Sequence, residues 1–205
     1  QKVIDQNFKA VDATLEHLYE VPIPGKVSAK DINRLTVSDK APAFVKEVTA
    51  MMMAGHGDDI PVSKMTVDGT YPSGTTQWEK RNISDLVPVW EPDVCIQCGN
   101  CAYVCPHSVI RAKFYHRDYL KNSPDDFKSA PINARGFPET QYSLQVYLED
   151  CTGCNLCVEV CPATDPHNRS RKAINMGEKD PILQKEQKNI EFFENIPWND
   201  RSKID

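Results

Sequence analysis

The sequence predicts an α+β fold in which a small cysteine-rich lobe follows a helical and loop-rich region. Eight cysteines all fall between residues 95 and 161. The segments beside them alternate apolar and polar residues, which is typical of short strands. Near the N-terminus, apolar residues recur instead at helical spacing. Together these patterns indicate helices first, and then a lobe of small strands and short helical turns.

Two helices are expected in the N-terminal region. Residues 5–20 carry an apolar face at helical spacing that ends before Pro22, and a second face runs from Pro42 to Gly55. Residues 64–83 are rich in Thr, Gly and Pro, and predict a loop-dominated segment. Because these elements bury little apolar surface, we expect the first 85 residues to belong to a larger assembly.

The eight cysteines form an internal repeat of the pattern C-x2-C-x2-C-x3-C-P, shifted by 56 residues (151 − 95). This is the cysteine spacing of bacterial two-cluster ferredoxins, in which the fourth cysteine of each run binds the other cluster. Three close cysteines can wrap a loop around one [4Fe–4S] cube. We therefore assign cluster one to Cys95, Cys98, Cys101 and Cys161, and cluster two to Cys151, Cys154, Cys157 and Cys105.

Three other uses of the cysteines compete with this interpretation. A disulfide framework suits small secreted proteins, and nothing in this sequence indicates secretion. Structural zinc sites have paired C-x2-C units rather than three evenly spaced cysteines. Unrelated thiols would not repeat at a fixed offset. The spacing favours two [4Fe–4S] clusters over zinc and disulfides.

The segments around the cysteines complete the predicted ferredoxin-like lobe. Residues 108–115 and 142–148 alternate like strands, and the proline-rich segment 87–93 is extended. The connection between the runs is long, and its middle, 121–138, predicts a surface loop. Residues 182–195 predict a last helix.

Four residues of the lobe are singled out for a possible place beside the clusters. Ile110 and Ile174 either shield the cubes from water or simply fill the core, and Trp90 packs over the lobe. His107 follows a cysteine and a proline directly; a surface histidine is the simpler interpretation, and tuning of a cluster potential is the alternative.

Composition and charge exclude several classes of function. The formal net charge is −5, and no segment forms a basic patch, which argues against nucleic-acid partners. No apolar run approaches the roughly 18 residues of a spanning helix, which argues against a membrane protein. No secretory leader stands at Gln1. Oxygen-sensitive clusters then suggest a cytoplasmic protein.

Three stretches together resemble one enzyme family. They are GTYPSGTTQWEKRNI at 69–83, VPVWEPDVCIQCGNCAYVCPHSVIRAK at 87–113 and EDCTGCNLCVEVCP at 149–162. This combination is similar to pyruvate:ferredoxin (flavodoxin) oxidoreductase, in which a Glu-Lys-Arg stretch precedes the two-cluster domain. The cysteine pattern alone would indicate only a ferredoxin fold.

The resemblance implies a division of the chain. Residues 1–60 would be the end of a γ-type 2-oxoacid oxidoreductase domain with its linker, and 61–86 the EKR-type connecting segment. Residues 87–176 would be the two-cluster ferredoxin-like domain, and 177–205 a C-terminal linker.

The resemblance also implies a function. The full enzyme decarboxylates pyruvate with thiamine diphosphate and Mg²⁺, passes the acetyl group to coenzyme A, and passes electrons through three [4Fe–4S] clusters to ferredoxin or flavodoxin. It is usually a homodimer. This chain would carry two of the clusters and no catalytic residue. Its partners would be the remaining domains of the same enzyme, where the thiamine site and the third cluster would lie.

A different class of function remains open at this point, namely a freestanding two-cluster electron carrier or a small subunit of another redox complex. Diffusible ferredoxins tend to be strongly acidic, whereas residues 88–176 hold 9 basic and 10 acidic residues. The near-neutral balance favours a tethered module.

Overall fold

The computed structural model describes residues 1–26 and 36–198. The chain divides into two compact units, Gln1–Lys64 and Met65–Asp205. Residues 27–35 and 199–205, which belong to the predicted segments 1–60 and 177–205, lie outside the described residues. Among the helices that are described, none combines the length and the apolar character needed to cross a membrane.

The first unit is helical. Helix α1 spans Lys2–Glu16 and has no buried residue, so the helix predicted for 5–20 begins earlier and ends earlier than expected. Its end has a local cause, because the Val-Pro-Ile-Pro stretch after it favours extended backbone. The second predicted helix is a π-helical turn, Val45–Thr49, continued by α2, Ala50–Met53. Two 3₁₀ turns follow, Gly57–Asp59 and Val62–Lys64.

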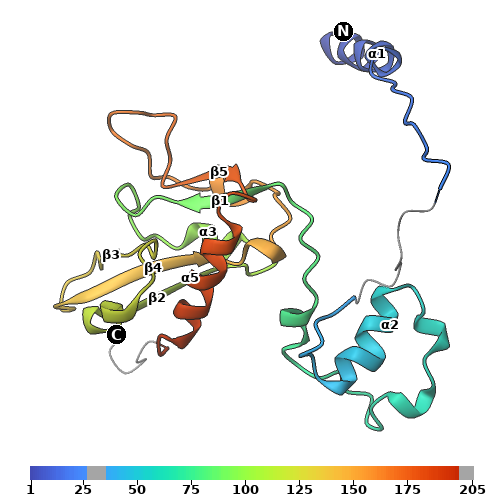
Figure 1. Ribbon diagram of the computed structural model, residues 1–205. Coiled ribbons are helices and arrows are strands. Elements are labelled where there is room, and N and C mark those ends of the chain that lie inside the picture. Colours follow the sequence, from blue (N-terminus) through green and yellow to red (C-terminus); the bar gives the residue numbers. More distant parts are fainter. Residues whose placement is uncertain (27–35, 199–205) are drawn as a thin grey trace. The chain divides into compact units, whose positions relative to one another are not determined.

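The second unit contains two small antiparallel sheets (Figure 1). Strand β1, Leu86–Trp90, pairs with β5, Ile174–Glu178. Strands β2, Ile110–His116, β4, Thr140–Val146, and β3, Ala130–Pro131, form the other sheet in the order β2-β4-β3. The predicted α+β class is confirmed, and the two predicted strands are present with bounds shifted by about two residues. The sequence did not predict β5, and β3 lies within the predicted loop 121–138.

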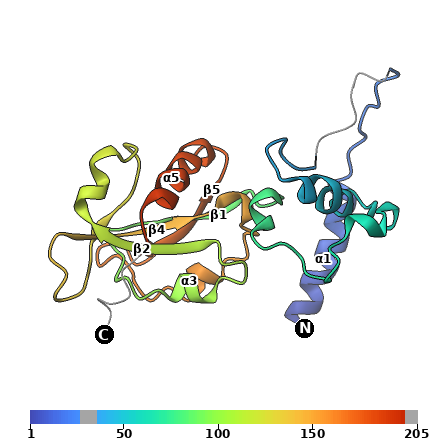
Figure 2. The same cartoon turned by 90° about the horizontal axis from the view of Figure 1, so that it is seen from below.

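Helices pack on both sides of the three-stranded sheet (Figure 2). Helix α5, Leu183–Asn195, lies on one side and contacts β4, which confirms the helix predicted for 182–195. Helix α3, Asn100–Val104, lies on the other side with α4, Leu156–Glu159, against which it packs. The remaining helical turns of this unit are 3₁₀: Thr75–Trp78, Arg117–Asn122 and Leu148–Asp150.

A buried lysine holds the end of α5. Lys113 of β2 is only 1% exposed, although lysine is almost never fully buried unless it is paired. Its Nζ donates to the carbonyls of Phe193 at 2.7 Å and Ile196 at 2.6 Å. These carbonyls lie at the C-terminal end of α5, where helix carbonyls have no intrahelical partner and a positive charge is favourable. The helix is therefore fixed to the sheet by a charge as well as by apolar packing.

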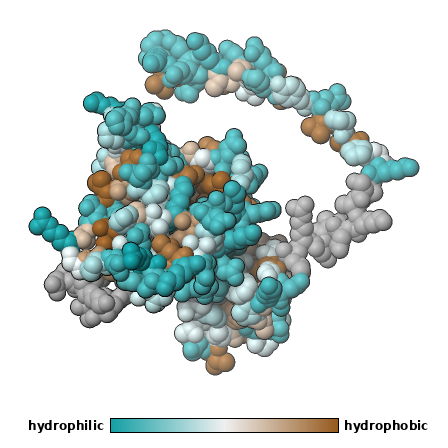
Figure 3. All heavy atoms as spheres, turned by 60° about the vertical axis from the view of Figure 1, so that its left-hand side comes forward, coloured by the Kyte–Doolittle hydropathy of each residue, from teal (hydrophilic) through white to brown (hydrophobic). Residues whose placement is uncertain are grey.

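The main core of the second unit surrounds the cysteines. Its buried members come from β1, β2, β4, β5, the residue before β2, the 3₁₀ turn after β4 and two of the cysteines: Val87, Trp90, Val109, Ile110, Tyr142, Leu144, Val146, Leu148, Cys151, Cys157 and Ile174. On the face shown in Figure 3, hydrophobic residues lie in small groups among hydrophilic ones. The apolar interior of this unit and its candidate site are thus the same region.

Candidate iron–sulfur centres

The two cysteine runs adopt the same backbone conformation. Gln97 and Gly153, which are 56 residues apart, both have left-handed φ values, 59° and 67°. Gly99 and Asn155, again 56 apart, have φ values of 76° and 65°. Each run then enters a short helix, α3 or α4. The sequence repeat is therefore also a structural repeat of two tight loops.

This conformation turns backbone amides toward the cysteine sulfurs. The N–H of Gln97 donates to Sγ of Cys95 at 3.3 Å, and the N–H of Gly153 donates to Sγ of Cys151 at 3.4 Å. Hydrogen bonds of this kind stabilise negative charge on sulfur and help to set the potential of a bound cluster. Each loop therefore places a backbone N–H where it stabilises an anionic sulfur.

One cavity is lined by the four cysteines assigned to cluster one, and it encloses about 340 Å³ of space between atoms, including its open side. Three of the four come from the first run and Cys161 comes from the second. Trp90, Tyr142, Leu144 and Ile174 form its apolar wall. The rings of Trp90 and Tyr142 meet edge to face, with centroids 6.0 Å apart.

A second cavity of about 350 Å³ is lined by the other four cysteines, Cys151, Cys154 and Cys157 with Cys105 from the first run. Ile110 and Met176 contribute to its apolar wall, and His107 lies at its margin. The structure thus brings together the two crossed sets that the spacing predicts. It also places Ile174 beside the first set and Ile110 beside the second.

The chemistry of both cavities suits thiolate-bound clusters. Desolvation raises the pKa of Cys101 to about 12 and that of Cys157 to about 11. Iron must therefore displace protons from buried thiols, and its binding stabilises thiolates that the cavity alone disfavours. Next to the first cavity, Nε1 of Trp90 is buried without a partner in the described part of the chain. An indole N–H requires an acceptor, and sulfur is one.

The second loop is packed tightly against the segment before β1. A Cβ added to Gly153 would lie 2.2 Å from Oγ of Ser84 and 3.2 Å from the carbonyl oxygen of Leu86. The same segment is held by the bond from the Asn82 N–H to the Glu149 carbonyl, 3.0 Å, and by the ion pair of Lys80 with Asp150. The glycine is thus required both by its φ value and by this close approach.

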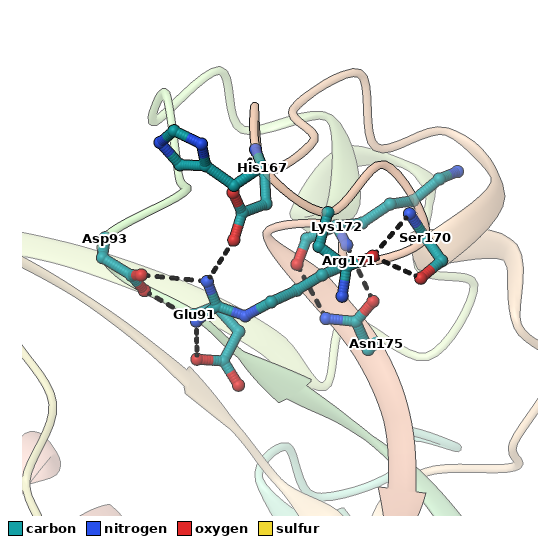
Figure 4. A network of polar contacts seen from close by, with 9 residues as sticks. Glu91, Asp93, His167, Ser170, Arg171, Lys172 and Asn175 are labelled. Carbon is teal, nitrogen blue, oxygen red and sulfur yellow. Dashed lines mark hydrogen bonds and ion pairs between the residues drawn. The ribbon is translucent and has the colours of Figure 1, made fainter.

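Two consecutive basic residues support the lobe near the fourth cysteine of the second run. Lys172 Nζ donates to the Val158 carbonyl at 2.7 Å, at the end of α4. The guanidinium of Arg171 bonds the carboxylates of Glu91, Asp93 and Asp165 (Figure 4). Sequence reasoning missed both residues, because nothing local to them indicates their partners.

The Arg171 network joins the chain before the first run to the chain after the second. Its ion pairs are 2.9 to 3.0 Å long. Hydrogen bonding to Arg171 lowers the pKa of Asp93, and the pKa of Asp165 is lowered by the His167 N–H and by Arg171. All four side chains keep contact with solvent, so we expect the network to orient the chain more than to stabilise it.

Comparison with known proteins agrees with this geometry. Residues 94–164 match the family described as a 4Fe–4S double cluster binding domain, and residues 30–84 match EKR, a domain of unknown function. The chain is 48% identical over 98% of its length to a putative pyruvate-flavodoxin oxidoreductase of Synechocystis. It is 47% identical over its whole length to a probable pyruvate-flavodoxin oxidoreductase of Escherichia coli. The chain is a homologue of one segment of the pyruvate-flavodoxin oxidoreductases.

The chain is short beside these relatives. It covers 17% of the Synechocystis protein and 18% of the Escherichia coli protein. A pyruvate:ferredoxin oxidoreductase of Moorella thermoacetica is 36% identical over 96% of the segment, which is 16% of that protein. The resemblance predicted from the Glu-Lys-Arg stretch and the double cysteine run is thereby confirmed.

Proposed function

We propose that the chain is the electron-transfer region of a pyruvate (2-oxoacid):ferredoxin or flavodoxin oxidoreductase and carries two [4Fe–4S] clusters. Cys95, Cys98, Cys101 and Cys161 hold cluster one, and Cys151, Cys154, Cys157 and Cys105 hold cluster two. The observation that carries this proposal is the pair of apolar cavities, each lined by three cysteines of one run and the fourth of the other. Neither zinc ribbons nor disulfides require each run to give its fourth cysteine to the other site.

Each cluster supplies one-electron chemistry, and the protein supplies everything else. The cysteines hold the iron, the apolar walls keep water away, and the amides of Gln97 and Gly153 stabilise negative sulfur. Crossed ligation places the two sites in one core, which keeps the path between them short. No side chain of this region needs to donate or accept a proton for that role.

The remaining parts of the proposed reaction lie elsewhere in a longer polypeptide. Thiamine diphosphate, Mg²⁺ and a third [4Fe–4S] cluster belong to other domains of the same enzyme, which are the first partners of this region. Ferredoxin or flavodoxin takes the electrons, the enzyme is a homodimer, and the compartment is the cytoplasm. The relatedness to longer oxidoreductases over nearly the whole chain supports the longer polypeptide, whereas the homodimer and the compartment are carried over from the family that the sequence resembles.

Iron analysis and spectroscopy of the full-length polypeptide test the proposal. We expect this region to contribute about eight iron and eight sulfide, because each cube contains four of each. The reduced protein should show the electron paramagnetic resonance (EPR) spectrum of interacting one-electron clusters, and pyruvate with coenzyme A should produce it. A colourless protein that holds zinc, or clusters that pyruvate never reduces, would refute the proposal. A native mass near 23 kDa would favour a freestanding carrier instead.

A further inference from the structure

Gln97 occupies a backbone conformation that the other half of the repeat gives to glycine. Its φ is 59°, and the equivalent residue is Gly153 with a φ of 67°. A side chain in the left-handed region costs about 1–2 kcal/mol. Residues kept in such a conformation usually have a compensating role, and here the side chain provides one.

The side-chain amide of Gln97 bonds one short segment twice. Its Nε2 donates to the carbonyl of Pro131 at 2.8 Å, and its Oε1 accepts from the N–H of Asn133 at 2.7 Å. The main-chain N–H of the same residue donates to Sγ of Cys95. One residue therefore joins the first cysteine loop to a segment more than 30 positions away.

That distant segment pairs with a strand that lines the first cavity. Ala130 and Pro131 form β3, in which Ala130 lies opposite Tyr142 of β4. The N–H of Ile132 continues the pairing, with a bond of 3.0 Å to the Thr140 carbonyl. Because Tyr142 lines the cavity, the two bonds of Gln97 connect the loop that holds the cysteines to the sheet that closes the site.

We propose that Gln97 is a positioning residue for cluster one. Its side-chain amide fastens the first cysteine loop to residues 131–133, which keeps the loop amide on the Cys95 sulfur and restricts the entry of water and oxygen. The proposal rests on the proposed function, since it assumes a cluster in this cavity. It also assigns a role to the long connection between the two cysteine runs, which supplies the anchor.

Cluster two should not depend on a side-chain anchor of this kind. Gly153 makes the equivalent amide-to-sulfur bond without a side chain, and its loop is held by Ser84 and Leu86 instead. The second loop can therefore serve as the reference for the first. Glycine at position 97 would give the first loop the residue that the second loop has at the equivalent position. It would remove only the two side-chain bonds.

Gln97→Gly in the full-length oxidoreductase is the test. We expect both clusters to assemble. After exposure to oxygen and anaerobic re-reduction, cluster one alone should have lost its EPR signal faster than in the wild type, by about tenfold, from the loss of two neutral hydrogen bonds. The line shape of the cluster-one signal should also change. Hydrogen exchange at the Asn133 amide should rise, and that measurement requires no activity. The signals are assigned with Cys105→Ala and Cys161→Ala.

Two further variants complete the experiment. Asn155→Gly makes the same kind of change at a left-handed position of the second loop, where the side chain bonds, among the described residues, only Glu159 of its own helix. It should leave cluster one unchanged. Gln97→Glu keeps the acceptor for Asn133 but cannot donate to Pro131, and should give an intermediate rate.

The outcomes separate the two proposals. Equal decay of cluster one in Gln97→Gly and wild type, with unchanged exchange at Asn133, would overturn the role of Gln97 alone. Equal acceleration of both clusters would overturn it as well. Absence of clusters from the wild-type protein would instead overturn the proposed function.

Discussion

The two cysteine loops have one backbone and two different environments. Both use left-handed residues at the same two positions, and both direct an amide to the first cysteine of the run. The first loop is fastened by the side chain of Gln97 to residues 131–133, at the end of β3. The second has no side chain at that position, and the segment before β1 packs directly on its glycine.

This comparison separates what a cluster requires from what the surrounding protein adds. The shared features are the cysteines, the left-handed residues and the amide-to-sulfur bonds, all of which concern the sulfur atoms. The features that differ concern anchorage. Loop one depends on the connection between the runs, whereas loop two depends on residues 84–86 and on Lys172. The two clusters can therefore be perturbed separately.

The largest expected effect comes from the crossed ligands. Cys105→Ala should abolish cluster two, which is held by the other run, and leave cluster one in place; Cys161→Ala should do the reverse. Losing a cluster ligand removes folding free energy as well as iron, so the lobe should also unfold at lower denaturant concentration. Iron content and EPR of the full-length protein measure the loss of the cluster, and denaturant unfolding measures the loss of stability. Loss of cluster one in Cys105→Ala would disprove the assignment.

The next effect concerns the close packing of loop two. Gly153→Ala should destabilise the lobe by about 2–3 kcal/mol, because it combines a left-handed alanine with a clash against Leu86 and Ser84. Cluster two should be lost before cluster one on denaturation. Gly99→Ala is the matched control, since a Cβ there meets nothing within 4 Å and only the φ cost remains. Equal destabilisation by the two substitutions would show that the packing of residues 84–86 has no effect.

A smaller effect is expected from the lysine at the end of α4. Lys172→Met removes the bond from Nζ to the Val158 carbonyl and a positive charge from the helix terminus, at a cost of about 1–2 kcal/mol. Denaturant unfolding followed by the cluster absorbance gives the difference. Lys185→Met, which loses only an exposed ion pair with Asp126, should change stability by less than about 0.5 kcal/mol. No difference between the two variants would contradict this role for Lys172.

Local patterns predicted most of the lobe. The cysteine spacing predicted both sets that line the cavities, and alternation predicted β2 and β4. Features that depend on distant partners escaped prediction. Strand β5 is recognisable only by its pairing with β1, more than 80 residues away. Lys113 has the sequence character of a surface residue, and its burial follows from α5, which packs over it. Gln97 likewise gains its role only when β3 is placed beside it.

The smallest effect is expected from the solvent-exposed ion pairs of Arg171. Arg171→Met removes the ion pairs that join the chain before loop one to the chain after loop two, and should lower the stability by less than Lys172→Met does, because solvent screens these charges. Chemical denaturation of wild type and variant gives the difference. A larger loss would mean that Arg171 holds the two halves together.

The pH dependence of that difference identifies the groups responsible for it. The pKa values of Asp93 and Asp165 are lowered in the folded state, so their contribution is fully present above the unfolded pKa of about 3.9 and is lost only as the pH falls through the lower folded pKa. The difference between wild type and Arg171→Met should therefore stay constant from pH 8 to pH 5. His167 lies beside this network, and its N–H bonds Asp165. A difference that changes between pH 8 and pH 5 would show that a group other than these two carboxylates contributes to the strength of the network.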